Sequence, residues 1–125
     1  MGELAAHYQL GLGVPKSFEK AFNWHKKAAE QGVGESQYAL GEMYAEGQYV
    51  NQDYTQAIYW LEESTKHEIV GPAAYMTLFI LYSNGWGTSK NLEKAQFFSK
   101  KISQDYLNNY QGEFTKRIQP KKQEL

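Results

Sequence analysis

Cysteine is absent from this chain of 125 residues, which excludes disulfide bonds and thiol chemistry. The formal net charge is only −1, and this balance does not favour nucleic acid as a partner. No apolar run approaches the roughly 20 residues of a membrane-spanning helix. No signal peptide is visible, because the first residues lack a basic stretch followed by an apolar one. The compartment therefore stays open: cytoplasmic by default, periplasmic or secreted if a leader was removed.

Arrangements of side chains that carry catalysis are also missing. The three histidines fall on separate predicted elements and share no metal-ligand spacing: His7, His25 and His67. Two Gly-x-Gly stretches, at 11–13 and 85–87, precede no Lys-Ser/Thr pair and follow predicted helices, so we interpret them as turns and not as phosphate loops. We expect His25 to be a surface side chain. The sequence predicts no enzyme, no catalytic residue, no metal site and no cofactor.

Aromatic residues are abundant, with ten Tyr, six Phe and three Trp, and many recur at a fixed spacing. One copy of the pattern consists of Tyr44, Gly47, Val50, Tyr54, Ala57 and Trp60. A copy 36 positions earlier consists of Tyr8, Gly11, Val14, Phe18, Ala21 and Trp24. A copy 38 positions later consists of Tyr82, Gly85, Leu92, Ala95 and Phe98. A period in this range indicates a solenoid of helix pairs, with the recurring aromatics in its core.

Each copy reads as two amphipathic helices joined by a glycine-containing loop. In the middle copy, Ala39, Leu40, Met43 and Tyr44 form one apolar helix face. This predicts a helix A over about 35–45. Asp53, with Gln56 three residues later, predicts the N-cap of a helix B that continues to about His67. Asn91 is the corresponding N-cap in the third copy. Gly41 lets helices A and B approach closely.

The residues Ala-Leu-Gly-x-x-Tyr-x-x-Gly at 39–47, followed by Val50, Asp53, Ala57 and Trp60, resemble the Sel-one-like repeat (SLR) family, a relative of the tetratricopeptide repeat. The resemblance covers about residues 4–102. In the third copy, Phe79 stands in place of Gly41 and Thr88 in place of Val50. The resemblance implies an all-α fold: a right-handed α-solenoid of about three antiparallel helix pairs. It also implies that such repeats act as adaptor scaffolds, by binding and not by catalysis.

We therefore expect a repeat array over residues 1–102, with repeats at about 1–32, 33–70 and 71–102. Beyond it, residues 103–118 lose the repeat pattern but keep helical apolar spacing, which predicts a C-terminal capping helix. Residues 119–125 are expected to form a flexible polar tail.

Charge is unevenly distributed along the chain. Residues 36–74 carry six acidic side chains and one basic, whereas residues 75–125 carry eight basic and four acidic. In this family the A helices line the concave side, and the repeat register then predicts a partner-binding strip of five residues: Glu35, Tyr38, Glu42, Met76 and Ile80. We call these five the predicted strip. It would suit a peptide or helix with both basic and apolar residues. The competing expectation is that the C-terminal segment folds back and covers the strip.

These observations leave three hypotheses about function. The first is a non-catalytic scaffold, an adaptor or regulator, that binds a protein or peptide on its concave helix-A face. The second is a bacterial immunity or neutralising protein for a cognate toxin or effector, a use that resembles that of other repeats of this type. The third, an enzyme or a nucleic-acid binder, is disfavoured by the missing polar cluster and the near-neutral charge. The oligomeric state stays open.

Overall fold

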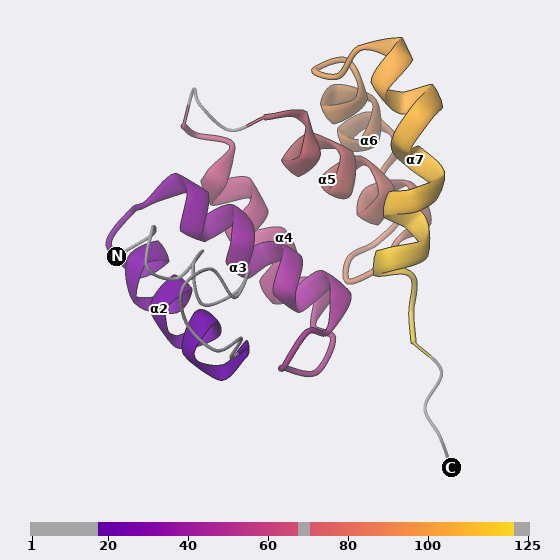
Figure 1. The fold of residues 1–125 in the computed structure, drawn as a ribbon. Helices are drawn as coiled ribbons and strands as arrows, with labels where there is room; N and C mark the ends of the chain where they lie inside the picture. The colour runs from indigo at the N-terminus through magenta and orange to yellow at the C-terminus, as the bar shows by residue number, and fades with distance from the viewer. Residues whose placement is uncertain (1–17, 68–70, 122–125) are drawn as a thin grey trace.

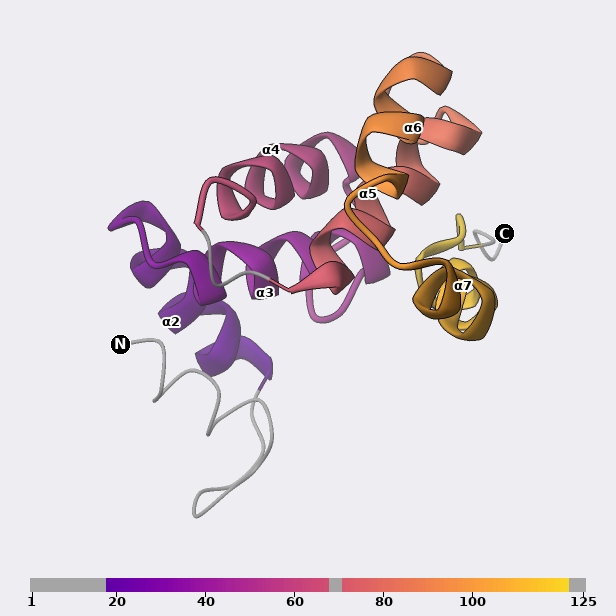
Figure 2. The ribbon, with the colours of Figure 1, turned by 90° about the horizontal axis from the view of Figure 1, so that it is seen from above.

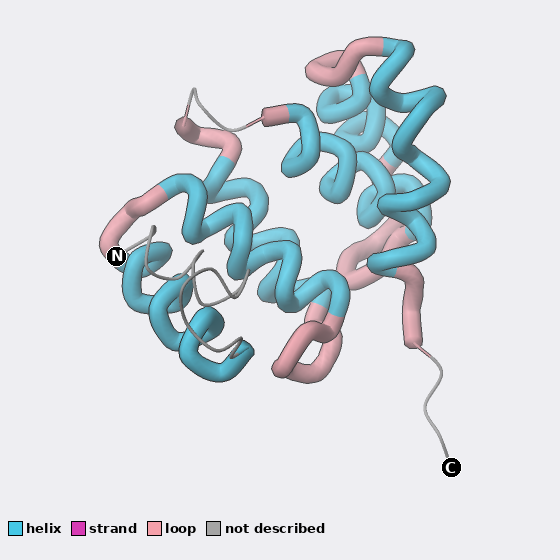
Figure 3. The backbone as a smooth tube through the Cα atoms, viewed as in Figure 1, coloured by secondary structure: helices cyan, strands magenta, loops and turns pink. Residues whose placement is uncertain are grey.

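The computed structural model describes residues 18–67 and 71–121, and this part of the chain contains six helices and no strand (Figures 1 and 3). They are α2 (Phe18–Glu30), α3 (Gly34–Glu46), α4 (Tyr54–Ser64), α5 (Pro72–Asn84), α6 (Leu92–Ser99) and α7 (Gln104–Ile118). The fold is an all-α solenoid, as the period predicts. The predicted helix before residue 18 and the last four residues of the predicted tail lie outside the described residues.

From α2 to α6, helices that are neighbours in the sequence are also neighbours in space. α3 packs on α4 and α5 on α6, each as a hairpin, while α2 packs on α3 and α4 on α5. Figure 2 shows the same order from above. Contacts between successive helix pairs are the defining feature of a solenoid.

The ends of the helices follow local sequence rules. The Asp53 carboxylate accepts a hydrogen bond from the Gln56 backbone N–H at 3.1 Å, and the Asn91 side chain accepts one from the Lys94 N–H at 3.0 Å. Both predicted N-caps are therefore confirmed. Gly47 ends α3 with φ of 73°, in the left-handed region that glycine enters at little cost.

Gly41 brings α3 and α4 together. A Cβ atom at this position would lie 2.7 Å from the Leu61 Cγ and 3.2 Å from the Leu61 backbone nitrogen. Any larger residue would push the two helices apart. The close approach predicted for this glycine is confirmed.

The core contains two clusters of buried apolar side chains. One joins α2 to α3 through Ala21, Phe22, Ala29, Leu40 and Met43. Trp60 is only half-buried and packs against this cluster from its edge. The second and larger cluster begins on α3 and continues through α7.

His25 does not lie on the surface, so that expectation is wrong. Its side chain is buried between α2 and α3, with Nδ1 3.3 Å from the Ser36 hydroxyl. Burial lowers the His25 pKa to about 4, because the charged imidazolium loses its hydration there. The small residue Ser36 at the start of α3 leaves room for the imidazole.

The last helix, α7, lies beside α5 and not at a distance from the array (Figures 1 and 2). Its N-cap is Ser103, whose hydroxyl accepts a hydrogen bond from the Tyr106 N–H at 3.2 Å. Phe114 and Ile118 are its buried residues, and the helix also contacts α3. It therefore spans α3 and α5, which are the A helices of the second and third repeats.

Candidate partner-binding site

The predicted strip is divided between exposed and buried positions. Glu35 is exposed in the first turn of α3, and Tyr38 is half-buried one turn later. Glu42 is 6% exposed, Met76 is 0% and Ile80 is 1%. Exposure of these last three side chains was expected from the register, and this expectation is wrong.

The cover over the strip is α7. Its Phe114 and Ile118 belong to the same buried cluster as Met76 and Ile80. Tyr38 of α3 and Tyr106 and Leu107 of α7 are half-buried and pack against that cluster. α5 packs on α6 and also on α7, so a second contact surface is added that the repeat register does not describe. The alternative, in which the C-terminal segment folds back over the strip, agrees with the burial of Met76 and Ile80 and not with the exposure of Glu35. Partner binding by the strip stays a prediction.

Glu42 is an acidic side chain in an apolar site. The Thr77 hydroxyl donates a hydrogen bond to Glu42 Oε1 at 2.6 Å, whereas the buried Oε2 has no hydrogen-bond partner among the described residues. Burial raises the Glu42 pKa to about 7 and the neighbouring Glu46 adds to the rise, while the Thr77 hydrogen bond and Arg117 oppose it. Burial therefore costs more free energy at Glu42 than at the apolar strip residues.

Arg117 of α7 and Lys121 beyond its end lie near acidic residues of α3. Burial raises the pKa of Tyr38, the Glu42 charge raises it further, and Arg117 lowers it. Burial also raises the Glu46 pKa, which Arg117 and Lys121 counteract. The basic end of the chain thus lies over part of its acidic middle.

Two residues of the α3–α4 segment hold the C-terminal end of α7, and we call Gln52 and Tyr54 the C-terminal latch. Gln52 Nε2 donates hydrogen bonds to three carbonyl oxygens: Ala45 at 3.0 Å, Ile118 at 3.2 Å and Gln119 at 2.9 Å. Gln52 Oε1 accepts one from the Lys121 N–H at 2.9 Å. The Tyr54 hydroxyl donates to the Ile118 carbonyl as well.

Sequence reasoning missed both latch residues. Tyr54 also stacks on Trp86 at 5.9 Å between ring centroids, and the repeat pattern had assigned it to the core alone. Gln52 gave no signal, because a polar loop residue is expected to face water. Its role depends on a contact across 66 residues of sequence.

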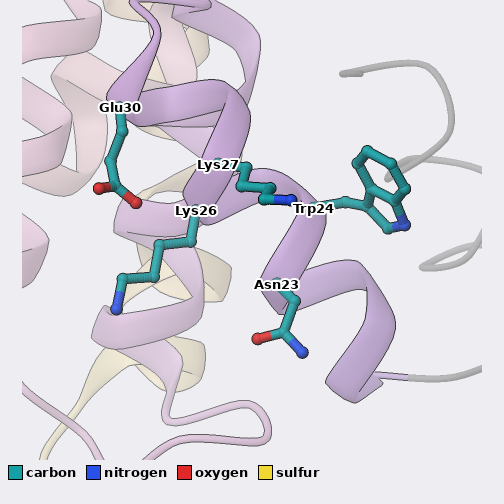
Figure 4. A pocket seen from close by; sticks show the side chains of 5 residues that line it. All are labelled: Asn23, Trp24, Lys26, Lys27 and Glu30. Atoms are coloured by element: carbon teal, nitrogen blue, oxygen red, sulfur yellow. The ribbon is translucent and has the colours of Figure 1, made fainter.

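Two other hollows do not form chemical sites. One lies on α2 and is lined by Asn23, Trp24, Lys26, Lys27 and Glu30, whose side chains point in different directions (Figure 4). The other lies on the outer face of α4 and α6, around Glu62, Lys94 and Phe97. Among the described residues, no three His, Asp or Glu side chains could hold a metal ion. In this part of the chain no helix is long and apolar enough to cross a membrane.

Comparison with known proteins identifies the repeats. Over 64 residues the chain is 34% identical to a putative sel1-like repeat-containing protein, R850, of Acanthamoeba polyphaga mimivirus; the match covers 51% of this chain and 12% of the viral protein. The crystal structure of a Sel1 repeat protein from Oxalobacter formigenes superposes with a TM-score of 0.73 and 31% identity, covering 80% of this chain and 39% of that one.

A second structure is c5321, a protective antigen of uropathogenic Escherichia coli strains that displays an SLR fold. It superposes with a TM-score of 0.72 and 30% identity, covering 79% of this chain and 21% of that one. The chain thus spans only a part of each relative. Proteins built from these repeats are generally non-enzymatic scaffolds for protein interactions. The Sel1 repeat family model matches residues 1–33, 34–67 and 72–104, so the chain belongs to the Sel1 repeat family.

Proposed function

We propose that this protein is a non-catalytic scaffold that binds a protein or peptide partner on the face formed by α3 and α5. The observation that carries the proposal is the nature of that face. It combines apolar side chains, Met76 and Ile80, with acidic ones, Glu42 and Glu46, and it accommodates a helix along two successive A helices. Helix-in-groove binding uses this combination of an apolar floor and charged margins.

The edge of this face is open in the present conformation. Glu35 is exposed and Tyr38 is half-buried, so a partner can contact the N-terminal half of α3 beside α7. Aromatic side chains at such margins contribute strongly to binding because they bury a large area at a low cost in conformational entropy. The proposed contact therefore begins at Glu35 and Tyr38 and extends toward Glu42.

A role as an immunity or neutralising protein is the alternative within the same class. It uses the same face and differs in the identity of the partner, which would be a toxin or effector. Identification of the partner separates the two roles.

The test is site-specific photo-crosslinking in the native source. A photoreactive residue replaces Glu35 on α3 or, as a matched control, the exposed Glu93 on α6. We expect one protein to crosslink from position 35 and not from position 93. The purified partner should then dissociate faster from Tyr38→Ala than from the unmodified protein. Crosslinking from position 93 alone, or a purified candidate that fails to bind, would contradict the proposal.

A further inference from the structure

We infer that α7 is an exchangeable occupant of the α3–α5 face, and that the partner presents a helix of the same chemistry: an apolar stripe that ends in basic residues. The inference rests on the proposed function and names both the class of partner and the element with which it competes. Four features of the contact between α7 and the face support it.

The first feature is chemical complementarity. α7 turns its apolar side chains to the core through Tyr106, Leu107, Phe114 and Ile118, and it carries Lys116 and Arg117 in its last turn. The face offers Met76 and Ile80 together with the acidic Glu42 and Glu46. A helix with both apolar and basic residues is the ligand that the charge and hydrophobicity of this face favour, and α7 is such a helix.

The second feature is that the charge pairing is incomplete. Arg117 is exposed, and its guanidinium lies over the Phe114 ring of its own helix, 4.3 Å from the centroid. No ion pair joins α7 to α3 within residues 18–67 and 71–121. The buried Glu42 Oε2 is left without a hydrogen-bond partner there. A better-placed donor on a partner helix could satisfy this atom, which α7 does not.

The third feature is the weak hold on most of α7. Only Phe114 and Ile118 are buried, and both lie in its C-terminal half. Asn108, Asn109 and Tyr110 are exposed, and a Cβ atom on Gly112 would meet nothing within 4 Å. A mid-helix glycine with no packing role lowers the stability of the helix. The N-terminal half of α7 can therefore separate from the face before the C-terminal half does.

The fourth feature is that the latch binds backbone atoms. Gln52 and Tyr54 donate to the carbonyl oxygens of Ile118 and Gln119, and Gln52 accepts from the Lys121 N–H. The last carbonyls of every helix lack partners within the helix. The latch can thus hold the C-terminal end of any helix that lies on this face, whatever its side chains.

The test uses a fluorescent peptide of residues 103–121 as the partner helix, added to full-length protein. Gly112→Pro in the protein weakens its own α7, while Gly112→Ala strengthens it, and the open space around position 112 keeps packing unchanged. Anisotropy should show the peptide binding at least about tenfold more tightly to Gly112→Pro than to the parent protein, because the fraction with an empty face rises. Binding to Gly112→Ala should be weaker than to the parent.

Two further variants test the contacts themselves. Adding Gln52→Ala to Gly112→Pro should weaken peptide binding, because the latch holds either helix, while adding Gln96→Ala on the exposed side of α6 should not. A peptide that carries Arg117→Glu should also bind more weakly. Equal binding to Gly112→Pro and Gly112→Ala, or no sensitivity to Gln52 and Arg117, would overturn the inference.

Hydrogen exchange of the unmodified protein gives a measurement that does not depend on a variant. The backbone amides of α7 should exchange faster than those of α5, and they should exchange faster still on addition of the peptide, because the bound peptide displaces α7 from the face. If the α7 amides exchange only through global unfolding of the protein, the inference is overturned. It is also overturned if Gly112→Pro forms a dimer and does not bind the peptide, because the face would then bind a second copy of the chain. The proposed function is tested separately: it fails if no partner crosslinks from position 35, whatever the peptide experiments show.

Discussion

Replacing Glu42 by glutamine should stabilise the protein at alkaline pH and leave its stability at acid pH nearly unchanged. In the folded protein the Glu42 carboxyl has a pKa of about 7 instead of its ordinary 4.5, chiefly because of burial. The folded state therefore holds a proton that the unfolded chain releases between these two values. Folding stability consequently falls as pH rises through this window. The difference corresponds to about 3 kcal/mol at about pH 8, which Glu42→Gln should recover.

His25 gives the opposite dependence over an overlapping window. Its folded-state pKa of about 4 lies below the ordinary 6.5, so the unfolded chain binds the proton first as pH falls. The contribution of His25 to the free energy of unfolding is fully present above pH 6.5 and is lost as the pH falls toward 4, again by about 3 kcal/mol. The two sites oppose each other between 4.5 and 6.5. Glu42→Gln removes the site that compensates for His25, so the variant should lose stability on acidification more steeply than the parent protein.

Urea unfolding followed by far-ultraviolet circular dichroism, at a series of pH values, measures the free energy of unfolding of both proteins. Glutamine keeps the volume of Glu42 and an oxygen that can accept the Thr77 hydrogen bond. Subtracting the two curves removes every other titrating group. A difference of the same size at all pH values would show that Glu42 does not titrate as its burial requires, and would refute the reasoning.

Three further substitutions test the packing, each by the midpoint of urea unfolding. Gly41→Ala should destabilise by about 1–3 kcal/mol, because its Cβ would lie 2.7 Å from Leu61 Cγ; an unchanged midpoint would contradict the close crossing. Gly112→Ala should stabilise by up to about 1 kcal/mol, since it adds helix propensity in open space, and a loss of stability would reveal an unseen contact. Trp60→Ala should cost about 1–3 kcal/mol, below the value for a fully buried aromatic, because Trp60 is half-buried.

The repeat period predicts most of the fold, because a solenoid is built from contacts between sequence neighbours. Asp53 and Asn91 cap their helices as predicted, since capping depends on residues three positions apart. Gly41 marks the close crossing because the register places it opposite helix B. Trp60 is less buried than its place in the repeat suggests. It packs only on the edge of the cluster between α2 and α3.

The covered face could not be predicted from the same pattern. A repeat register describes the contact between α5 and α6, whereas Met76 and Ile80 are buried in a cluster that also includes Phe114 and Ile118 of α7. The helical spacing of residues 106–118 indicates a helix, but a helix beyond the last repeat can lie at the end of the array or across its A helices. The choice depends on Gln52 and Tyr54, whose bonds to residue 118 are long-range contacts without a sequence signature.

The uneven charge of the sequence acquires a physical explanation from this arrangement. The acidic middle and the basic end are parts of one contact, because Arg117 and Lys121 lie near Glu46. Within that contact the desolvation of Glu42 is not fully compensated, because its buried Oε2 has no hydrogen-bond partner among the described residues. An apolar cover selected for stability alone would favour a neutral residue at position 42, because an unpaired carboxyl is costly to bury. An acidic residue there gains its full electrostatic value only when the face is open to water or to a basic helix. On the inference above, opening of the face would return the Glu42 carboxyl to water or to a basic helix and would remove this cost.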